Sequence, residues 1–91
     1  MAKDLLVKDL EKIAKAMGNE RRLIILRLLK SRSMNVQQIS EKLKLSFKST
    51  SRHLGVLKSV GLVDTRKTSL QVFYYLNRPT HSVVKIFLDY L

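Results

Sequence analysis

The first sixty residues show the periodicity of amphipathic helices. Over residues 4–17, apolar side chains recur at intervals of three and four positions, and lysines and acidic residues occupy the other side. Gly18 ends this pattern, and Asn19 can cap a second helix over residues 20–30. The apolar residues of this second helix are too many for one narrow stripe, so we expect it to be the most buried helix.

A pair of short helices follows, and its signals are the clearest in the chain. Asn35 is a good N-cap residue, and Gln38 stands three positions later, where a capping box needs it. These residues predict a helix over 36–43. Ser46 can cap the next helix, which we expect over residues 47–60. Two short helices joined by about three residues form a helix-turn-helix.

The period changes after Gly61, where β-branched and aromatic residues become dense. Residues 62–65 and 70–76 predict the two strands of a hairpin, and residues 66–69 predict its polar, basic tip. A last helix is expected after Pro79. The chain is therefore predicted to be a single domain over residues 1–91, mainly α with a small β-hairpin. Four helices, two strands and a final helix are the order of a winged helix-turn-helix.

The helix expected over residues 47–60 has two unlike sides. At about 100° per residue, one side is mostly apolar, and the opposite side is basic and polar. The inner side carries Thr50, His53, Leu54 and Leu57, and the outer side carries Lys48, Arg52, Gly55 and Ser59. This division predicts a helix that is anchored by one side and presents cations to a partner on the other.

The second helix of a helix-turn-helix enters the major groove of DNA, and the side chains here suit that role. Arg52 has the planar fork that pairs with guanine O6 and N7, whereas Lys48 can serve a base or a phosphate. Phe47 can touch a thymine methyl group or pack back on the domain. The candidate DNA-binding residues are Ser46, Phe47, Lys48, Ser49, Ser51 and Arg52, with Arg66 and Lys67 at the hairpin tip for the backbone or minor groove. An ordinary solvated surface is the alternative.

The distribution of charge favours a basic face that binds a polyanion. The 91 residues carry a net charge of +11. Residues 19–79 hold 13 of the 18 Lys and Arg residues but only three of the seven acidic residues. A compact polycation attracts polyanions, and this concentration places the attraction in the middle of the chain. A surface that is merely solubilising is the alternative.

The two ends of the chain are almost neutral and rich in apolar residues. In the last helix, one apolar stripe can face the domain: Val83, Val84, Phe87 and Leu91. Other apolar residues remain outside it, and together with those of the first helix they would make a patch that soluble monomers rarely tolerate. We therefore expect a homodimer through the first and last helices, with interface residues Leu6, Leu10, Ile86, Phe87 and Tyr90. Membership of all of them in one core is the alternative.

Several motifs resemble the ArsR family of bacterial and archaeal winged-helix regulators. They are residues 17–26 (MGNERRLIIL), Leu45-Ser46, Ser51-Arg52-His53-Leu54 with Val56-Leu57, Gly61-Leu62-Val63, and Phe73-Tyr74-Tyr75-Leu76-Asn77. The resemblance covers about residues 16–77. It implies a homodimeric transcription regulator, in our expectation a repressor, whose fourth helix reads double-stranded DNA. A two-fold dimer with reading helices about 34–36 Å apart predicts an inverted repeat.

The resemblance does not extend to the metal sites of family members. Where the family has a cysteine pair before and at the start of the third helix, this chain has Asn35 and Gln37, and it contains no cysteine. The last helix offers only His81 and Asp89, too few ligands for a metal. We expect no metal and no other cofactor, and the sequence indicates no small-molecule effector. His53 is expected to be a packed structural histidine.

Other classes of protein fit the sequence less well. Two distant histidines, no cysteine and no glycine-rich phosphate loop leave little from which to build an enzyme's site. No apolar run approaches the roughly 20 residues that span a membrane, and no signal peptide is evident, so we expect a cytoplasmic protein without a membrane partner. A basic winged-helix module that binds RNA, a protein partner, or DNA without sequence preference is the alternative function.

Overall fold

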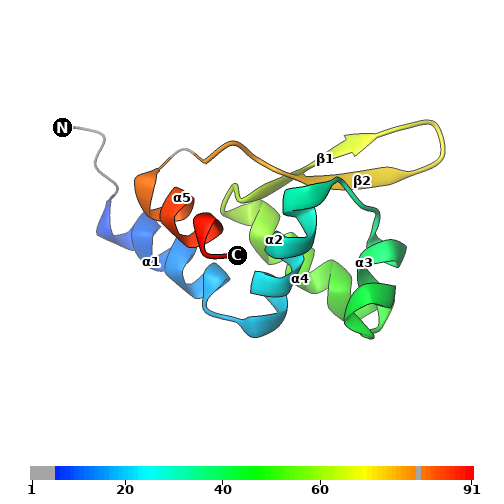
Figure 1. The fold of residues 1–91 in the computed structure, drawn as a ribbon, viewed down its shortest axis with the longest axis horizontal. Coiled ribbons are helices and arrows are strands. Elements are labelled where there is room, and N and C mark those ends of the chain that lie inside the picture. Colours follow the sequence, from blue (N-terminus) through cyan, green and yellow to red (C-terminus); the bar gives the residue numbers. More distant parts are fainter. Residues whose placement is uncertain (1–5, 80) are drawn as a thin grey trace.

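The computed structural model describes residues 6–79 and 81–91, and within them five helices and one hairpin follow each other in the predicted order. The helices are α1 (Val7–Met17), α2 (Glu20–Ser31), α3 (Val36–Leu43), α4 (Phe47–Ser59) and α5 (Ser82–Asp89). The antiparallel strands are β1 (Val63–Lys67) and β2 (Val72–Leu76). The hairpin projects away from the end of the molecule where α1 and α5 lie (Figure 1).

The predicted bounds of the central helices agree with the structure. α2 and α4 end within one residue of the expected positions, and α3 has the predicted bounds. Its capping box is complete, because the backbone N–H of Gln38 donates to Asn35 Oδ1 at 2.8 Å and the backbone N–H of Asn35 donates to Gln38 Oε1 at 2.9 Å. Positions 4 and 5, predicted to begin the first helix, lie outside the described residues.

The predicted bounds of the hairpin are wrong. β1 continues to Lys67, so Arg66 and Lys67 pair with Phe73 and Val72 of β2 instead of forming the tip. The turn lies over 68–71, where the backbone N–H of Thr68 donates to the Gln71 carbonyl at 2.8 Å. The Thr68 hydroxyl also accepts from the Gln71 N–H at 3.1 Å. These local bonds place the turn two residues later in the chain than the predicted tip at 66–69.

The core is built around α2, as predicted. Ile25 and Leu26 of α2 have no exposed surface, and neither have Ile39 of α3 and Leu54 and Leu57 of α4. α2 contacts α1, α3, α4 and β2. The helix-turn-helix is therefore held against the rest of the domain by one continuous apolar cluster.

The hairpin is bonded to the start of α3. Met34, just before α3, pairs with Tyr74 of β2: the Met34 N–H donates to the Tyr74 carbonyl at 3.0 Å, and the Tyr74 N–H donates to the Met34 carbonyl at 2.8 Å. The Asn35 amide adds a side-chain bond, donating to Gln71 Oε1 at 2.8 Å. The hairpin therefore has backbone contacts beyond its own two strands.

The last helix faces the core with most of its predicted stripe, and Phe87 is the exception. Val84 and Leu88 are buried, four positions apart on one side of α5. Phe87, which was expected to face the domain, is 44% exposed. Val83 and Leu91 are partly buried against the core as predicted, so Leu88 takes the place in the stripe that was predicted for Phe87.

Candidate nucleic-acid interface

α4 is anchored by its inner side. Thr50, Leu54 and Leu57 have no exposed surface, and the Thr50 hydroxyl donates to the Ser46 carbonyl at 2.9 Å. The predicted inner side of this helix is thus its buried side. Truncating a residue such as Leu54 would cost about 2–5 kcal/mol of stability, so the orientation of α4 is firmly set.

The outer side of α4 is exposed, again as predicted. Lys48, Arg52, Gly55 and Ser59 are all exposed. Lys48 and Arg52 are four residues apart and therefore neighbours on the helix surface. Among the residues that the structure describes, ion pairs occur only within α1 (Lys15–Glu11) and within α5 (Lys85–Asp89). The cations of α4 are left without acidic partners in that part of the chain.

The first turn of α4 adds hydroxyl groups and one aromatic ring to this side. The Ser46 hydroxyl accepts from the Ser49 N–H at 3.0 Å and so caps the helix, while Ser49 and Ser51 are half-buried along its flank. Phe47 is 63% exposed. Two roles are predicted for Phe47, and its exposure favours contact with a partner over packing on the domain.

The hairpin carries two exposed cations that point in different directions. Arg66 and Lys67 are both exposed, but successive residues of a strand face opposite sides. Lys67 shares its side with Thr65, whose hydroxyl accepts from Lys58 Nζ of α4 at 3.2 Å. Lys67 is thus on the side of the hairpin that faces α4. We call the set Phe47, Lys48, Arg52, Arg66 and Lys67 the reading surface.

Arg22 and His53 form a contact that the sequence did not indicate. Nη1 of Arg22, on α2, lies 3.3 Å from Nδ1 of His53, on α4. His53 is half-buried. Burial lowers the pKa of His53 below its ordinary value of 6.5, and the positive charges of Arg22, Arg21 and Arg52 lower it further. Two residues 31 positions apart are joined here by tertiary packing, for which a single sequence carries no local signal.

A second exposed surface is apolar. Leu6 and Leu10 at the start of α1, and Ile86, Phe87 and Tyr90 at α5, are all exposed, by 40% to 84%. The three residues of the α5 region line one depression together with Leu23 and Leu91. Leu6 and Leu10 do not line it. We call the five exposed residues the terminal apolar surface.

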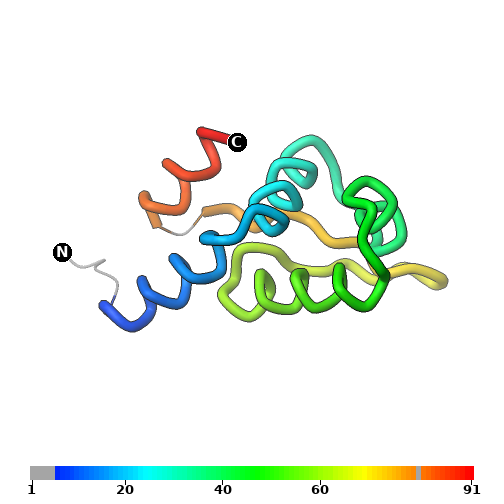
Figure 2. The backbone as a smooth tube through the Cα atoms, turned by 90° about the horizontal axis from the view of Figure 1, so that it is seen from below, coloured from blue at the N-terminus to red at the C-terminus, as the bar shows by residue number. Residues whose placement is uncertain are grey.

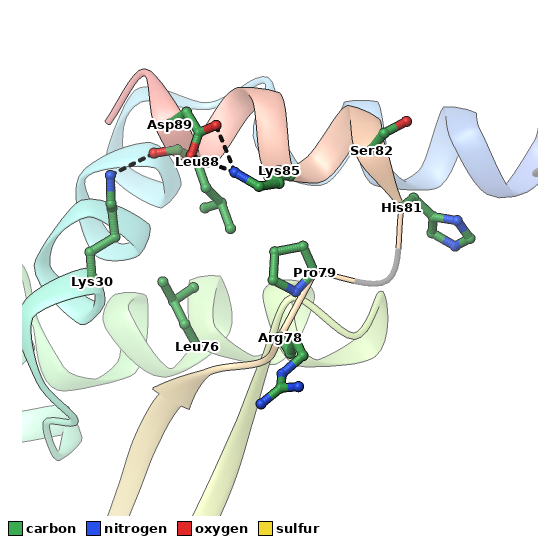
Figure 3. Close-up of a pocket in the computed structure, with 9 residues that line it drawn as sticks. All are labelled: Lys30, Leu76, Arg78, Pro79, His81, Ser82, Lys85, Leu88 and Asp89. Atoms are coloured by element: carbon green, nitrogen blue, oxygen red, sulfur yellow. Dashed lines mark hydrogen bonds and ion pairs between the residues drawn. The ribbon is translucent and has the colours of Figure 1, made fainter.

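A cleft of about 520 Å³ lies between α2, β2 and α5 (Figure 3). Lys30 crosses one end of it, and its Nζ donates to the Leu88 carbonyl near the end of α5 at 2.7 Å. His81 and Asp89 line the same cleft. Among the described residues, no three His, Cys, Asp or Glu side chains lie close enough together to hold a metal ion. None of the described helices has the length and hydrophobicity to cross a membrane.

The central part of the chain is similar to a known protein family. Residues 19–65, which span α2, the helix-turn-helix and the start of the hairpin, match the model of the bacterial regulatory proteins of the arsR family. The chain belongs to the ArsR family. ArsR proteins are DNA-binding transcription regulators with a winged helix, and both the predicted family and the predicted fold are confirmed. The aligned part of this chain covers 60% of the length of the first curated relative described below.

Named relatives support the assignment. The transcriptional activator HlyU of Vibrio cholerae is 46% identical over 65 residues, covering 71% of this chain and 60% of that protein. The structure of reduced HlyU superposes with a TM-score of 0.78 at 39% identity, over 92% of this chain and 85% of that one. A homodimeric winged helix-turn-helix domain of a possible ArsR-family regulator from Mycobacterium bovis superposes with a TM-score of 0.78 at 27% identity, over 92% of this chain and 75% of that one. The transcriptional repressor PagR of Bacillus anthracis superposes with a TM-score of 0.76 at 28% identity, over 93% of this chain and 95% of that one.

Proposed function

We propose that this ArsR-family protein is a homodimeric regulator that recognises a specific DNA sequence through α4. The observation that carries the proposal is the two-sided nature of α4. Three fully buried residues fix the helix, while Lys48 and Arg52 face outward without acidic partners in the described part of the chain. A rigid element that presents donors is what base recognition requires.

Each residue of the reading surface has a role that follows from its chemistry. Arg52 donates two hydrogen bonds to guanine O6 and N7, and Lys48 serves a neighbouring base or phosphate. Phe47 contacts a thymine methyl group, and Ser46, Ser49 and Ser51 donate to phosphates near the helix start. Lys67 contacts the flanking backbone from the side of the hairpin that faces α4, and Arg66 reaches the backbone or minor groove from the other side.

The terminal apolar surface is the proposed dimer interface. Its residues Ile86, Phe87 and Tyr90, with Leu6 and Leu10, are large and exposed, and association would remove them from water. The Mycobacterium bovis neighbour is homodimeric, which supports dimerisation but does not identify the interface. Two-fold symmetry would set the two α4 helices about 34–36 Å apart and make the operator an inverted repeat.

The proposed outcome of binding is repression in the cytoplasm, where the dimer covers its operator without catalysis. Relatives include both an activator and a repressor. Because these regulators act by binding, we propose no enzymatic activity, and the sequence names no effector.

Selection of bound duplexes from a random pool tests the proposal. We expect enrichment of a symmetric motif bound at least about a thousandfold more tightly than random duplex. The Arg52→Ala protein provides the matched control, since its selected motif should lose preference at one position in each half-site. Binding without enrichment would favour the alternative of DNA binding without sequence preference, and preference for RNA in competition would favour an RNA-binding module.

A further inference from the structure

The guanidinium group of Arg22 joins three helices at one point. Its Nε donates to the Ala16 carbonyl at 2.7 Å and its Nη2 to the Lys15 carbonyl at 3.1 Å, both in the last turn of α1. Its Nη1 lies 3.3 Å from His53 Nδ1 on α4. Arg22 itself is held at the start of α2, where its backbone N–H donates to Asn19 Oδ1 at 3.1 Å.

These contacts satisfy groups that the helices leave open. The last carbonyls of a helix have no partner within it and carry the negative end of its dipole. Arg22 fills that role for α1 with a charge of the correct sign. Two of its nitrogens donate to carbonyls of α1, and the third, Nη1, is directed at α4. The same guanidinium therefore links the end of α1 to His53 on α4, and these two helices lie against each other (Figure 2).

The contact with His53 requires one protonation state. Arginine is always a donor, so Nδ1 of His53 must be the acceptor, which is possible only in the neutral ring. The charged groups that act on His53 in the described part of the chain are Arg22 and Arg21 from α2 and Arg52 from α4 itself, all of them cations. No carboxylate from α1, α3 or β1 is among them. A protonated His53 would lose its bond to Arg22 and be repelled by it.

We propose that Arg22 and His53 are positioning residues for DNA recognition, which lock α4 to the end of α1 while His53 is neutral. This inference rests on the proposed function. If α1 belongs to the dimer interface, the position of α4 relative to α1 sets the separation of the two reading helices, and a specific inverted repeat tolerates little change in that separation. Binding to random DNA depends on charge and tolerates much more.

The test compares three proteins that differ at position 53, the wild type, His53→Asn and His53→Leu, across pH at constant salt. The wild type should lose operator affinity several-fold as pH falls from about 8 to about 5, with the loss concentrated below 6.5 because the pKa of His53 is lowered, and affinity for random duplex should be unchanged or higher. His53→Asn keeps an acceptor close to Nδ1 and cannot titrate, so it should bind the operator like wild type at the higher pH and keep that affinity at the lower pH. His53→Leu, without an acceptor, should bind the operator about tenfold more weakly at both values.

Two further variants complete the design. His81→Asn removes the other histidine, which has no bond to Arg22, and should keep the wild-type pH profile. Arg22→Lys keeps the charge but cannot reach all three partners, so it should weaken operator binding without weakening random binding. Should His53→Leu fail to fold, as judged by circular dichroism, the profile of His53→Asn decides.

The outcomes distinguish failure of the proposed function from failure of the positioning role. If the wild type does not prefer any operator at either pH, the proposed function is wrong. If it prefers an operator but His53→Asn retains the pH dependence, or Arg22→Lys binds that operator like wild type, the positioning role is wrong and the reading role of α4 stands.

Discussion

The reading surface and the terminal apolar surface are both exposed, but they differ in how their charge is handled. Around the reading surface, basic residues outnumber acidic ones more than fourfold over residues 19–79, and the described ion pairs lie elsewhere. At the terminal apolar surface, one ion pair lies within α1 and one within α5, and five large apolar side chains are exposed. The two surfaces therefore suit different partners. The reading surface offers cations to a polyanion, and the terminal apolar surface offers apolar area to another apolar surface.

The two surfaces should therefore respond to different conditions. Contacts with phosphates release counterions, so binding at the reading surface should weaken steeply with salt. Association through apolar area depends little on salt. The following changes separate the two surfaces experimentally.

Phe87→Asp should have the largest effect. A carboxylate placed in the proposed interface would be desolvated without a partner on dimerisation, so the protein should sediment as a monomer. Loss of the linked second half-site should reduce operator affinity by at least about a hundredfold. Leu70→Asp is the matched control, because Leu70 is apolar and 90% exposed but lies at the hairpin turn; this variant should remain dimeric. A dimeric Phe87→Asp protein would place the interface elsewhere.

Arg52→Ala should cost about 1–3 kcal/mol on the operator and much less on random duplex, because a base contact is lost. Fluorescence anisotropy with both duplexes measures the two losses. Lys12→Ala, which removes one exposed charge from α1, should cost little on either. Equal losses for Arg52→Ala on the two duplexes would assign Arg52 to the backbone instead of a base.

Lys67→Ala should have a smaller and uniform effect. If Lys67 contacts a phosphate, its removal should weaken all duplexes alike and lower the slope of log affinity against log salt by about one. The ratio of operator to random affinity should stay constant. A change in that ratio would show that Lys67 reads sequence.

The smallest expected effect is on stability in mild acid. The pKa of His53 is lowered in the folded protein, so the unfolded chain takes up the proton more readily. Stability from this group is complete above the unfolded pKa near 6.5 and is lost as pH falls below it toward the folded pKa. Denaturant titrations at several pH values should show this decline in the wild type and a flatter profile in His53→Asn. An identical decline in both would assign it to other groups.

Local signals in the sequence were sufficient for the helices. Asn35, Gln38 and Ser46 act as caps through bonds to residues three positions away, and such short-range chemistry is visible in a single chain. The two-sided pattern of α4 is equally local, since helical geometry alone decides which residues face each other. For this reason the predicted inner and outer sides of α4 agree with the structure.

Features that depend on distant partners were not predictable in the same way. The Arg22–His53 contact joins residues 31 positions apart, and Met34 pairs with Tyr74 across 40 positions. The strand ends at Arg66 and Lys67 were misplaced because the turn bonds of Thr68, not strand composition, set the register. The prediction that Phe87 faces the domain is wrong, because composition does not fix the rotation of an apolar helix about its axis. The DNA and interface roles of individual residues stay predictions.

The bonds from Met34 and Asn35 to the hairpin also bear on the length of the operator. A hairpin joined to the beginning of α3 cannot swing independently of the helix pair that approaches the groove. The base pairs met by α4 and the phosphates met by Lys67 would then stand at a constant offset along the duplex. An insertion between those two parts of a half-site could not be absorbed by flexing of the protein, so the DNA itself would have to deform.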